Sequence, residues 1–465
     1  NPAAWWRWAV VLLPGTLLYF FPVGGLDRAQ AHVFGVFVAT IIALVAQPVK
    51  MGVSVVLAMT LLAVTGALPP GKVLSGFSNV VVWLIFTAFL FSKAITATGF
   101  GARIGYLFIR RFGRTPLRLG YSIAAADLVL APFIPSDTAR GGGVICPITR
   151  GVAEAFGEDG AAGGRMGGFL ILTAFHTTYT ASAMFLTSMA ANPLIAEMAL
   201  KAGHVELSWL RWLSGSILPG TLALIVLPWL IARLMPPGIA DTAPARAHAA
   251  SQLARMGSLS RRERWLAAIM GGVMFGWVTS PWHGINNTFV ALMGLCAILL
   301  AGVVSWDDLL GEGKAWDALI WFAPLIMMSE VLNENGTIRV LSRHLFSALA
   351  GWQPAAALLV LAAAYCYVHY AFASMTAHVT ALYPAFLAAA LAAGVPPMAA
   401  ALALAYFSNL DAAMTHYGTG SAPVYFGSGY VRQGEWWRVG FVISLANLVL
   451  WLGIGSLWWK LIGIW

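Results

Sequence analysis

The stretch that decides the fold is APFIPSDTARGGG, residues 131–143, in which the polar tripeptide SDT at 136–138 interrupts an apolar region. The segments on either side, residues 120–130 and 141–155, are too short and too rich in glycine to be independent membrane spans. Irregular backbone is tolerated inside a bilayer only where protein or a water-filled cavity satisfies its polar groups. The pattern therefore predicts a re-entrant helical hairpin with its tip at the SDT sequence.

The whole chain has the composition of a membrane protein. Its 465 residues are 60% hydrophobic and only 10% charged, and their mean hydropathy is +0.79. Soluble domains carry about 25% charged residues, so most of this chain must be solvated by lipid or by its own core. Apolar runs long enough to cross a bilayer recur, and we expect about eleven spans. The predicted fold class is an all-α polytopic protein embedded in the lipid bilayer.

The net charge of +9 reflects orientation in the membrane rather than nucleic-acid binding, because the arginines gather in a few loops. One cluster lies in residues 103–118 and the other in residues 246–264. Counting spans places both clusters on the side of the N-terminus. Positively charged loops face the cytoplasm, so we expect a cytoplasmic N-terminus and a location in a bacterial inner membrane.

A weak internal repeat divides the chain on either side of a polar, proline-containing stretch, residues 236–263, which we interpret as a cytoplasmic linker. Ser92 and Gly99 recur 237 residues later as Ser329 and Gly336, and the sequence SDTAR of the hairpin tip is echoed as SMTAH after 238 residues. An odd number of spans between equivalent points gives the copies opposite orientations. We therefore predict two inverted repeats, each with a re-entrant hairpin and a broken helix.

Three further polar interruptions complete this pattern. The second hairpin tip is SMT at 374–376, and two other stretches, residues 177–193 and 414–423, combine Gly or Pro with Ser, Thr and Asn as in helices unwound in mid-membrane. For the latter two, an ordinary loop outside the membrane is the alternative. Helix N-termini and hydroxyls attract carboxylates, although such groups also serve as simple caps. The expected substrate-binding residues are Ser136, Asp137, Thr138, Asn192, Pro193, Ser374, Met375, Thr376, Thr419, Gly420, Ser421 and Pro423.

Two stretches resemble the divalent anion/sodium symporter family of the ion transporter superfamily. They are PSDTARGGG at 135–143 and the segment from THY at 415–417 to PVYFGSGY at 423–430, and their order and spacing extend the match over nearly the whole chain. The resemblance is closest to the branch of citrate/succinate antiporters and plastidic 2-oxoglutarate/malate translocators. It implies a Ser-Asn-Thr at each tip, whose Asn helps enclose sodium ions beside the substrate. Here Asp137 and Met375 stand in place of the two Asn residues.

The replacement of the two Asn residues affects whether transport can be coupled to sodium. The thioether of Met375 is a poor ligand for a hard cation, whereas Asp137 leaves a sodium ion near Ser136 and Asp137 open. Basic residues, Arg140 and His378, follow each tip at equivalent positions of the repeat. We interpret them as fixed counter-charges that replace sodium beside a carboxylate. The alternative is that Arg140 pairs with Asp137 and merely closes the tip.

Other charged residues within apolar segments have less definite roles, although charge inside a membrane is costly. Lys93 and Glu330 occupy equivalent positions of the repeat, and they either snorkel from helix ends or form a charge pair. His176, His369 and Asp411 either carry protons or are satisfied polar groups that face other helices.

The resemblance also implies a domain arrangement and a mechanism. A scaffold that holds a homodimer interface is expected at residues 1–118 and 264–351. A mobile transport domain that carries both hairpins is expected at residues 119–235 and 352–465. This domain would slide across the membrane with its substrate, as in an elevator.

The predicted function is sodium-independent exchange of C4 to C6 di- or tricarboxylates, such as succinate, malate, 2-oxoglutarate, citrate or tartrate. Sodium-coupled uptake of the same substrates is the alternative. An anion channel is a third candidate, but a channel favours charged rings or a continuous filter over paired hairpin tips. We do not expect an enzyme or a cofactor, because the sequence contains no HExxH, GxSxG or CxxC motif.

Overall fold

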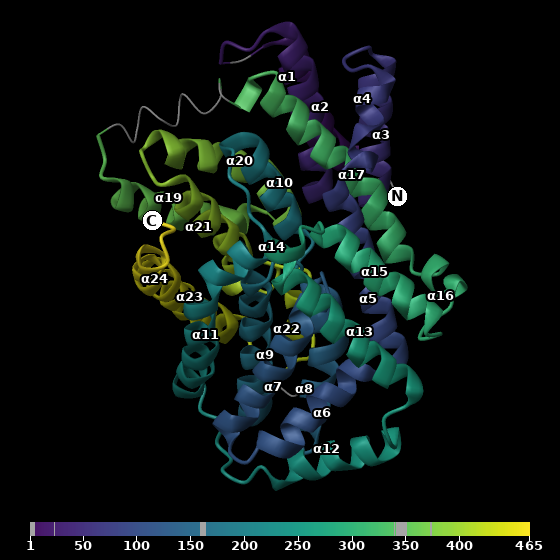
Figure 1. Cartoon of the computed structure of the whole chain (residues 1–465). Helices are drawn as coiled ribbons and strands as arrows, with labels where there is room; N and C mark the ends of the chain where they lie inside the picture. Colours follow the sequence, from purple (N-terminus) through teal and green to yellow (C-terminus); the bar gives the residue numbers. More distant parts are fainter. Residues whose placement is uncertain (1–4, 23, 159–163, 339, 341–350, 373) are drawn as a thin grey trace.

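The computed structural model describes residues 5–22, 24–158, 164–338, 340, 351–372 and 374–465, and within these residues it contains helices and loops but no strand. Figure 1 shows the helices as one bundle, with α12 at one end and the first helices at the other. Part of the second scaffold segment expected from the sequence lies outside the described residues.

Capping residues and glycine set the limits of the helices that precede the first hairpin. Asp27 begins α2 with a capping box, in which its side chain accepts from the backbone N–H of Gln30 and the Gln30 side chain accepts from that of Asp27. Gly99 ends α5 with a φ of 73°, a conformation that favours glycine. These elements are α1 (Trp5–Phe20), α2 (Arg28–Ala46), α3 (Met51–Val64), α4 (Pro70–Leu74), the 3-10 turn η2 (Ser75–Ser78), α5 (Val80–Thr98) and α6 (Phe100–Phe112).

Proline residues shape the first hairpin. Thr115 caps α7 and Pro116 is its first residue, where a missing N–H costs nothing. Pro132 and Pro135 cannot continue the helical hydrogen bonds, so the chain leaves the helix before the tip. The elements of this region are α7 (Pro116–Leu130), the 3-10 turn η3 (Ala131–Phe133), the π-helical turn η4 (Thr138–Ile145), α8 (Cys146–Glu154), α9 (Arg165–Met184), α10 (Ala191–Gly203) and α11 (Trp209–Leu234).

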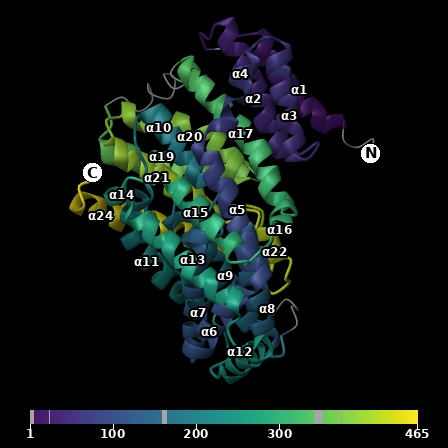
Figure 2. The same cartoon turned by 45° about the vertical axis from the view of Figure 1, so that its right-hand side comes forward.

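The linker predicted at residues 236–263 contains a helix, α12, which packs along α6 (Figures 1 and 2). The buried guanidinium of Arg103 fixes this arrangement, since it pairs with Glu263 at 2.5 Å and donates to the carbonyl of Gly257 at 2.8 Å. Both arginine clusters therefore lie at the same end of the molecule. The helices of this region are α12 (Ala243–Met256), α13 (Arg261–Val278), α14 (Ser280–His283), α15 (Asn287–Leu300), α16 (Trp306–Leu310) and α17 (Gly313–Glu334).

The second half repeats the order of elements seen in the first. In each half a helix, a 3-10 turn, a tip and a second helix form a hairpin whose two arms pack against each other. A further helix then ends in an irregular segment. The elements are α19 (Pro354–Val368), η5 (His369–Ala371), α20 (Met375–Ala392), α21 (Pro397–Leu410), η6 (Asp411–Ala413), α22 (Ala422–Phe426), α23 (Gln433–Asn447), the π-helical η7 (Leu448–Ile454) and α24 (Gly455–Leu461). The inverted relation of the halves stays a prediction.

Six helical stretches among the described residues are long and apolar enough to cross a membrane, judged by length and composition. They are Val80–Thr98, Trp209–Leu234, Gly313–Glu334, Pro354–Ala371, Met375–Ala392 and Gln433–Leu461. Other apolar helices, such as Met51–Val64 and Asn287–Leu300, are shorter than a single bilayer crossing. The all-helical class is confirmed, and the count of about eleven spans stays a prediction.

The centre of the bundle is formed by α9 and α21, which pack against each other. Every residue of α9 from Met166 to Met184 is buried, as is every residue of α21 from Ala399 to Leu410. Both helices end in an irregular segment, residues 185–190 after α9 and residues 411–421 after α21. Because the helices are central, their ends bring irregular backbone into the interior of the protein.

Candidate functional site

The first tip is built from side chains that cap the second arm of its hairpin. The hydroxyl of Ser136 accepts from the backbone N–H of Ala139 at 3.1 Å, and Asp137 accepts from that of Thr138 at 2.8 Å. Asp137 is 7% exposed, whereas Thr138 is exposed and Ser136 half-buried. The tip therefore presents hydroxyls to its surroundings while its carboxylate points into the protein.

That carboxylate meets the irregular segment 411–421, which we call the last break. The second oxygen of Asp137 accepts from the hydroxyls of Thr419 and Ser421, the latter at 3.1 Å. Gly420 lies so close to the tip that a Cβ atom there would stand 2.3 Å from Thr138 Oγ1. The structure thus brings together two groups of predicted site residues that lie more than 280 positions apart. Pro423, just beyond the last break, is exposed.

Arg140 is fully buried and all of its donors are used within the protein. Its Nε pairs with Asp127 at 2.8 Å, Nη1 donates to the carbonyls of Ile134 and Ser188, and Nη2 donates to Thr178 O and to Ser182 Oγ at 2.6 Å. The guanidinium therefore joins the hairpin to α9 and to the break that follows it. Its ionic partner is Asp127, not Asp137 as one interpretation of the sequence held. The geometry does not favour Arg140 as a free counter-charge for a substrate.

Asn192 holds the break after α9 together. Its side-chain NH₂ donates to the carbonyls of Ser182 and Phe185 at 2.9 and 3.0 Å, and its oxygen accepts from Asn409 at 2.8 Å. Because this amide is occupied on both sides and fully buried, it has no free donor for a ligand. Pro193 lines a pocket of about 540 Å³ that also includes Glu197 and none of the tip residues.

The second tip is capped in the same way as the first. Ser374 is the N-cap of α20 and accepts from the backbone N–H of Ala377 at 3.3 Å. Met375 is buried, whereas Ser374 and Thr376 are half-buried. One turn later, His378 is fully buried and its Nδ1 lies 3.0 Å from the carboxylate of Asp411. The second tip therefore also reaches the last break, through His378.

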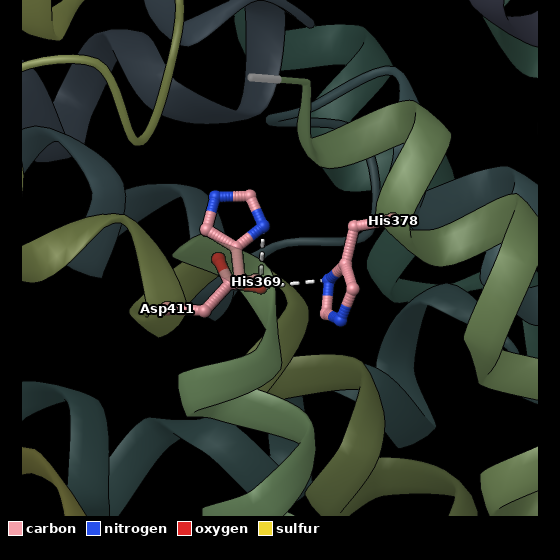
Figure 3. A group of neighbouring side chains, drawn as sticks. All are labelled: His369, His378 and Asp411. Carbon is pink, nitrogen blue, oxygen red and sulfur yellow. Dashed lines mark ion pairs between the residues drawn. The ribbon is translucent and has the colours of Figure 1, made fainter. Parts of the chain in front are cut away.

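His369 adds a second contact between this hairpin and the last break. Its Nε2 donates to the carbonyl of Gly418 at 2.6 Å, and its Nδ1 lies 3.4 Å from Asp411 (Figure 3). Both hairpins thus contact residues 411–421. Asp127, which neutralises Arg140, and Asn409, which holds Asn192, were not expected from the sequence. An acidic residue inside the apolar arm of a hairpin was the available signal for Asp127.

The other charged residues singled out in the sequence lie away from the tips. Lys93 pairs with Glu312 at 3.7 Å and Glu330 with Lys201 at 3.1 Å, so the two are not partners of each other. His176 is buried and shares a hydrogen bond of 2.6 Å with Tyr179. Each of these groups has a protein partner, although His176 Nε2 finds none among the described residues.

The fold matches a solved transporter. The structure of YdaH from Alcanivorax borkumensis superposes with a TM-score of 0.61 at 14% identity, over 99% of this chain and 98% of that one. Sequence comparison then decides the family, because residues 2–465 match the sodium:sulfate symporter transmembrane region. The chain belongs to this family. The family predicted from the tip sequences is confirmed, and the chain is an integral membrane transporter rather than an enzyme.

Similar members of the family come from bacteria and plants. The "Putative malate transporter YflS" of Bacillus subtilis (strain 168) is 44% identical, over 98% of this chain and 96% of that protein. The "Dicarboxylate transporter 1, chloroplastic" of Arabidopsis thaliana is 39% identical, over 97% and 82%. The "Inner membrane protein YbhI" of Escherichia coli (strain K12) is 34% identical, over 100% and 99%.

The environment of Arg140 predicts that its guanidinium is needed for stability. We expect Arg140→Lys to keep the charge but lose the planar set of donors. The variant should be destabilised by roughly 3 kcal/mol, because buried carbonyls would be left without a donor at a cost of about 1–3 kcal/mol each. Arg150→Lys is the matched control, because Arg150 pairs with Glu154 on the surface at 3.8 Å and should change stability by less than about 1 kcal/mol. Thermal unfolding in detergent measures both. Normal unfolding of Arg140→Lys together with lost substrate binding would instead favour the counter-charge role.

The close approach of Gly420 to Thr138 predicts a compensating pair of substitutions. Gly420→Ala alone should force the tip and the last break apart, at a cost of about 1–3 kcal/mol for overpacking. Thr138→Ala removes the clashing Oγ1, so the double variant should regain most of the lost stability in the same unfolding assay. Gly143→Ala, which meets nothing within 4 Å, is the control. Additive losses in the double variant would contradict the contact.

Proposed function

We propose that this chain exchanges small dicarboxylates of the malate and succinate class across a bacterial inner membrane. Similar family members are named for malate or dicarboxylate transport, and another is named as an inner membrane protein. The observation that carries the proposal is the meeting of both hairpin tips with one irregular segment, residues 411–421, in the interior of the protein. Such sites at broken helices bind substrate in secondary transporters.

The two tips supply the binding groups in this proposal. Hydroxyls of Ser136, Thr138, Ser374 and Thr376 lie where the second arms of the hairpins begin, and free N–H groups at helix N-termini attract anions. All four residues are at least partly exposed. A dicarboxylate offers one charged group to each tip, which suits a substrate of four to six carbons.

The chemistry of the second tip supports exchange without sodium. Met375 supplies a thioether, and the imidazoles of His369 and His378 gather with the carboxylate of Asp411 one turn beyond this tip. A hard cation such as sodium prefers a set of oxygen ligands. Since Arg140 is neutralised by Asp127, we place the counter-charge for the substrate at the second tip, on His378 in its protonated, metal-free form. An empty carrier that retains this charge would cross the membrane slowly.

Sodium-coupled uptake is the second candidate, and one observation favours it. The carboxylate of Asp137 lies beside the hydroxyls of Thr419 and Ser421, and Arg140 does not neutralise it. A negative charge beside a dianionic substrate is unfavourable unless a cation accompanies it. A sodium ion held by these oxygens would meet that requirement.

The wider arrangement follows the family resemblance. We propose a homodimer with a scaffold and a transport domain that moves as an elevator. In support, α17 and α15 pack on α3 and α5, while α20 and α21 pack on α10 and α9. The gathering of both arginine clusters at one end supports a cytoplasmic location of that end. The cytoplasmic N-terminus is proposed from the count of spans that precede the clusters.

Exchange predicts that substrate inside the vesicle accelerates uptake. In liposomes containing the purified protein, we expect preloading with malate to raise the uptake of radiolabelled malate at least tenfold, equivalent to about 1.4 kcal/mol of barrier. Replacement of sodium by choline should change little. Thr138→Ala and Thr376→Ala should each raise the half-saturating concentration about tenfold, since a hydrogen bond to a charged group contributes ~1.5–3 kcal/mol.

Thr60→Ala is the control for these variants, because Thr60 is exposed and its hydroxyl bonds only to its own helix. Uptake into empty liposomes that disappears in choline would establish the sodium-coupled alternative. Failure to transport any di- or tricarboxylate under either condition would contradict the proposed substrate class.

A further inference from the structure

Three side chains from three separate elements converge beside the second tip. His369 lies in η5, His378 in the first turn of α20 and Asp411 in η6, and all three are 0% exposed. One oxygen of Asp411 lies 3.0 Å from His378 Nδ1 and 3.4 Å from His369 Nδ1 (Figure 3). One ligand atom from each of the three residues lies within 4.8 Å of the others. We call these residues the His-His-Asp cluster.

The two imidazoles are held with Nδ1 facing the carboxylate. Because the Gly418 carbonyl can only accept, the contact of 2.6 Å from His369 Nε2 places a proton on Nε2 and leaves the lone pair of neutral His369 on Nδ1. The ring of His378 packs against Tyr365, with ring centroids 4.3 Å apart, and against Phe372. Metal-binding histidines are commonly oriented by a carbonyl in this way.

The contacts within the cluster are short but are not hydrogen bonds. By distance and angle, the carboxylate oxygens of Asp411 and the Nδ1 atoms of His369 and His378 find no hydrogen-bond partner among the described residues. Buried polar groups without a partner are rare. Two imidazole nitrogens and a carboxylate oxygen at about 2.0–2.1 Å from one tetrahedral ion would be separated by roughly 3.3 Å. The two separations from the carboxylate oxygen, 3.0 and 3.4 Å, lie on either side of that value, and the ligand atoms of the two histidines lie within 4.8 Å of each other.

We propose that the His-His-Asp cluster binds a divalent transition-metal ion of the zinc class through His369 Nδ1, His378 Nδ1 and Asp411. Two imidazoles and one carboxylate suit zinc or cobalt, whereas magnesium, calcium and sodium prefer oxygen ligands throughout. Three protein ligands leave a fourth position for water or for a carboxylate group. With Asp411 ionised and both histidines neutral, the occupied site carries a net charge of +1.

The site goes beyond the proposed function and does not depend on it, because metal binding is measured without transport. Ser374 and Thr376, the half-buried residues of the second tip, lie within one turn of His378. We therefore place the entry of an ion at this tip, the partly exposed part of the chain that precedes His378. Long incubation precedes each measurement, since the ligands are buried.

The test is a metal titration of the full-length protein in detergent after removal of metals with a chelator. Zinc is quantified by equilibrium dialysis and elemental analysis, and cobalt by the visible absorption bands of a tetrahedral site. We expect one equivalent per chain. Asp411→Asn, His378→Ala and His369→Ala should each weaken the affinity about 100-fold or more, since even the loss of an outer-shell partner costs 10–100-fold. His283→Gln, an exposed histidine outside the cluster, should bind as the wild type does.

Two further variants test metal binding if one of these substitutions prevents folding. Asp411→Glu keeps a carboxylate and should retain a tetrahedral cobalt spectrum, and His378→Cys should add a thiolate-to-cobalt charge-transfer band. Size-exclusion profiles and circular dichroism establish folding. The proposal would be overturned by zinc binding that persists in Asp411→Asn, His378→Ala and His369→Ala alike. It would also be overturned by a folded wild type that binds no more zinc than Asp411→Asn, which would favour a cluster that holds protons only.

Discussion

The arrangement of the site depends on one irregular segment, residues 411–421, that lies in the interior of a membrane protein. Backbone that leaves a helix inside a bilayer must find other partners for its polar groups, and the polar side chains of such a segment need partners too. Here the two hairpins supply partners of both kinds. The carbonyl of Gly418 accepts from His369 in the second hairpin, while Thr419 and Ser421 donate to Asp137 at the first tip. The polar groups of the last break and of the two hairpins thus satisfy one another. The three therefore form one connected unit.

Buried charge imposes a second constraint on this unit. An isolated ion in a low-dielectric interior is costly unless it is paired and hydrogen-bonded, and Arg140 with Asp127 meets both conditions. The pair consequently gives the first tip a rigid base but no net charge. The charge that remains near that tip is the carboxylate of Asp137. In the proposed site, the sign of the charge around the substrate is therefore set by Asp137 and by the His-His-Asp cluster, and Arg140 does not contribute to it.

The sequence predicted those features that depend on local pattern. Prolines beside a polar tripeptide, glycines and the tip sequences were enough to predict the positions at which the helices are interrupted and the family. Partners from distant parts of the chain were not predictable. Any acidic residue that the fold brings near Arg140 could neutralise it, and the sequence does not show which one is near. Asn192 was predicted from its position beside a break, yet its amide is occupied by Asn409 and two carbonyls. Sequence pattern locates a break and does not tell which side chains hold it closed.

The two hairpins use equivalent positions for different purposes. Arg140 of the first hairpin corresponds to His378 of the second, 238 residues later, and Asp127 corresponds to Tyr365 at the same spacing. Arg140 contacts Asp127 in the first hairpin, and His378 contacts Tyr365 in the second. In the first hairpin the contact is ionic and uses the Nε donor of the arginine, while its remaining donors go to other groups of the protein. In the second it is a ring packed on a ring, which holds the imidazole in place without occupying its nitrogens. His378 Nδ1 is therefore left to face Asp411, a carboxylate contributed by the last break.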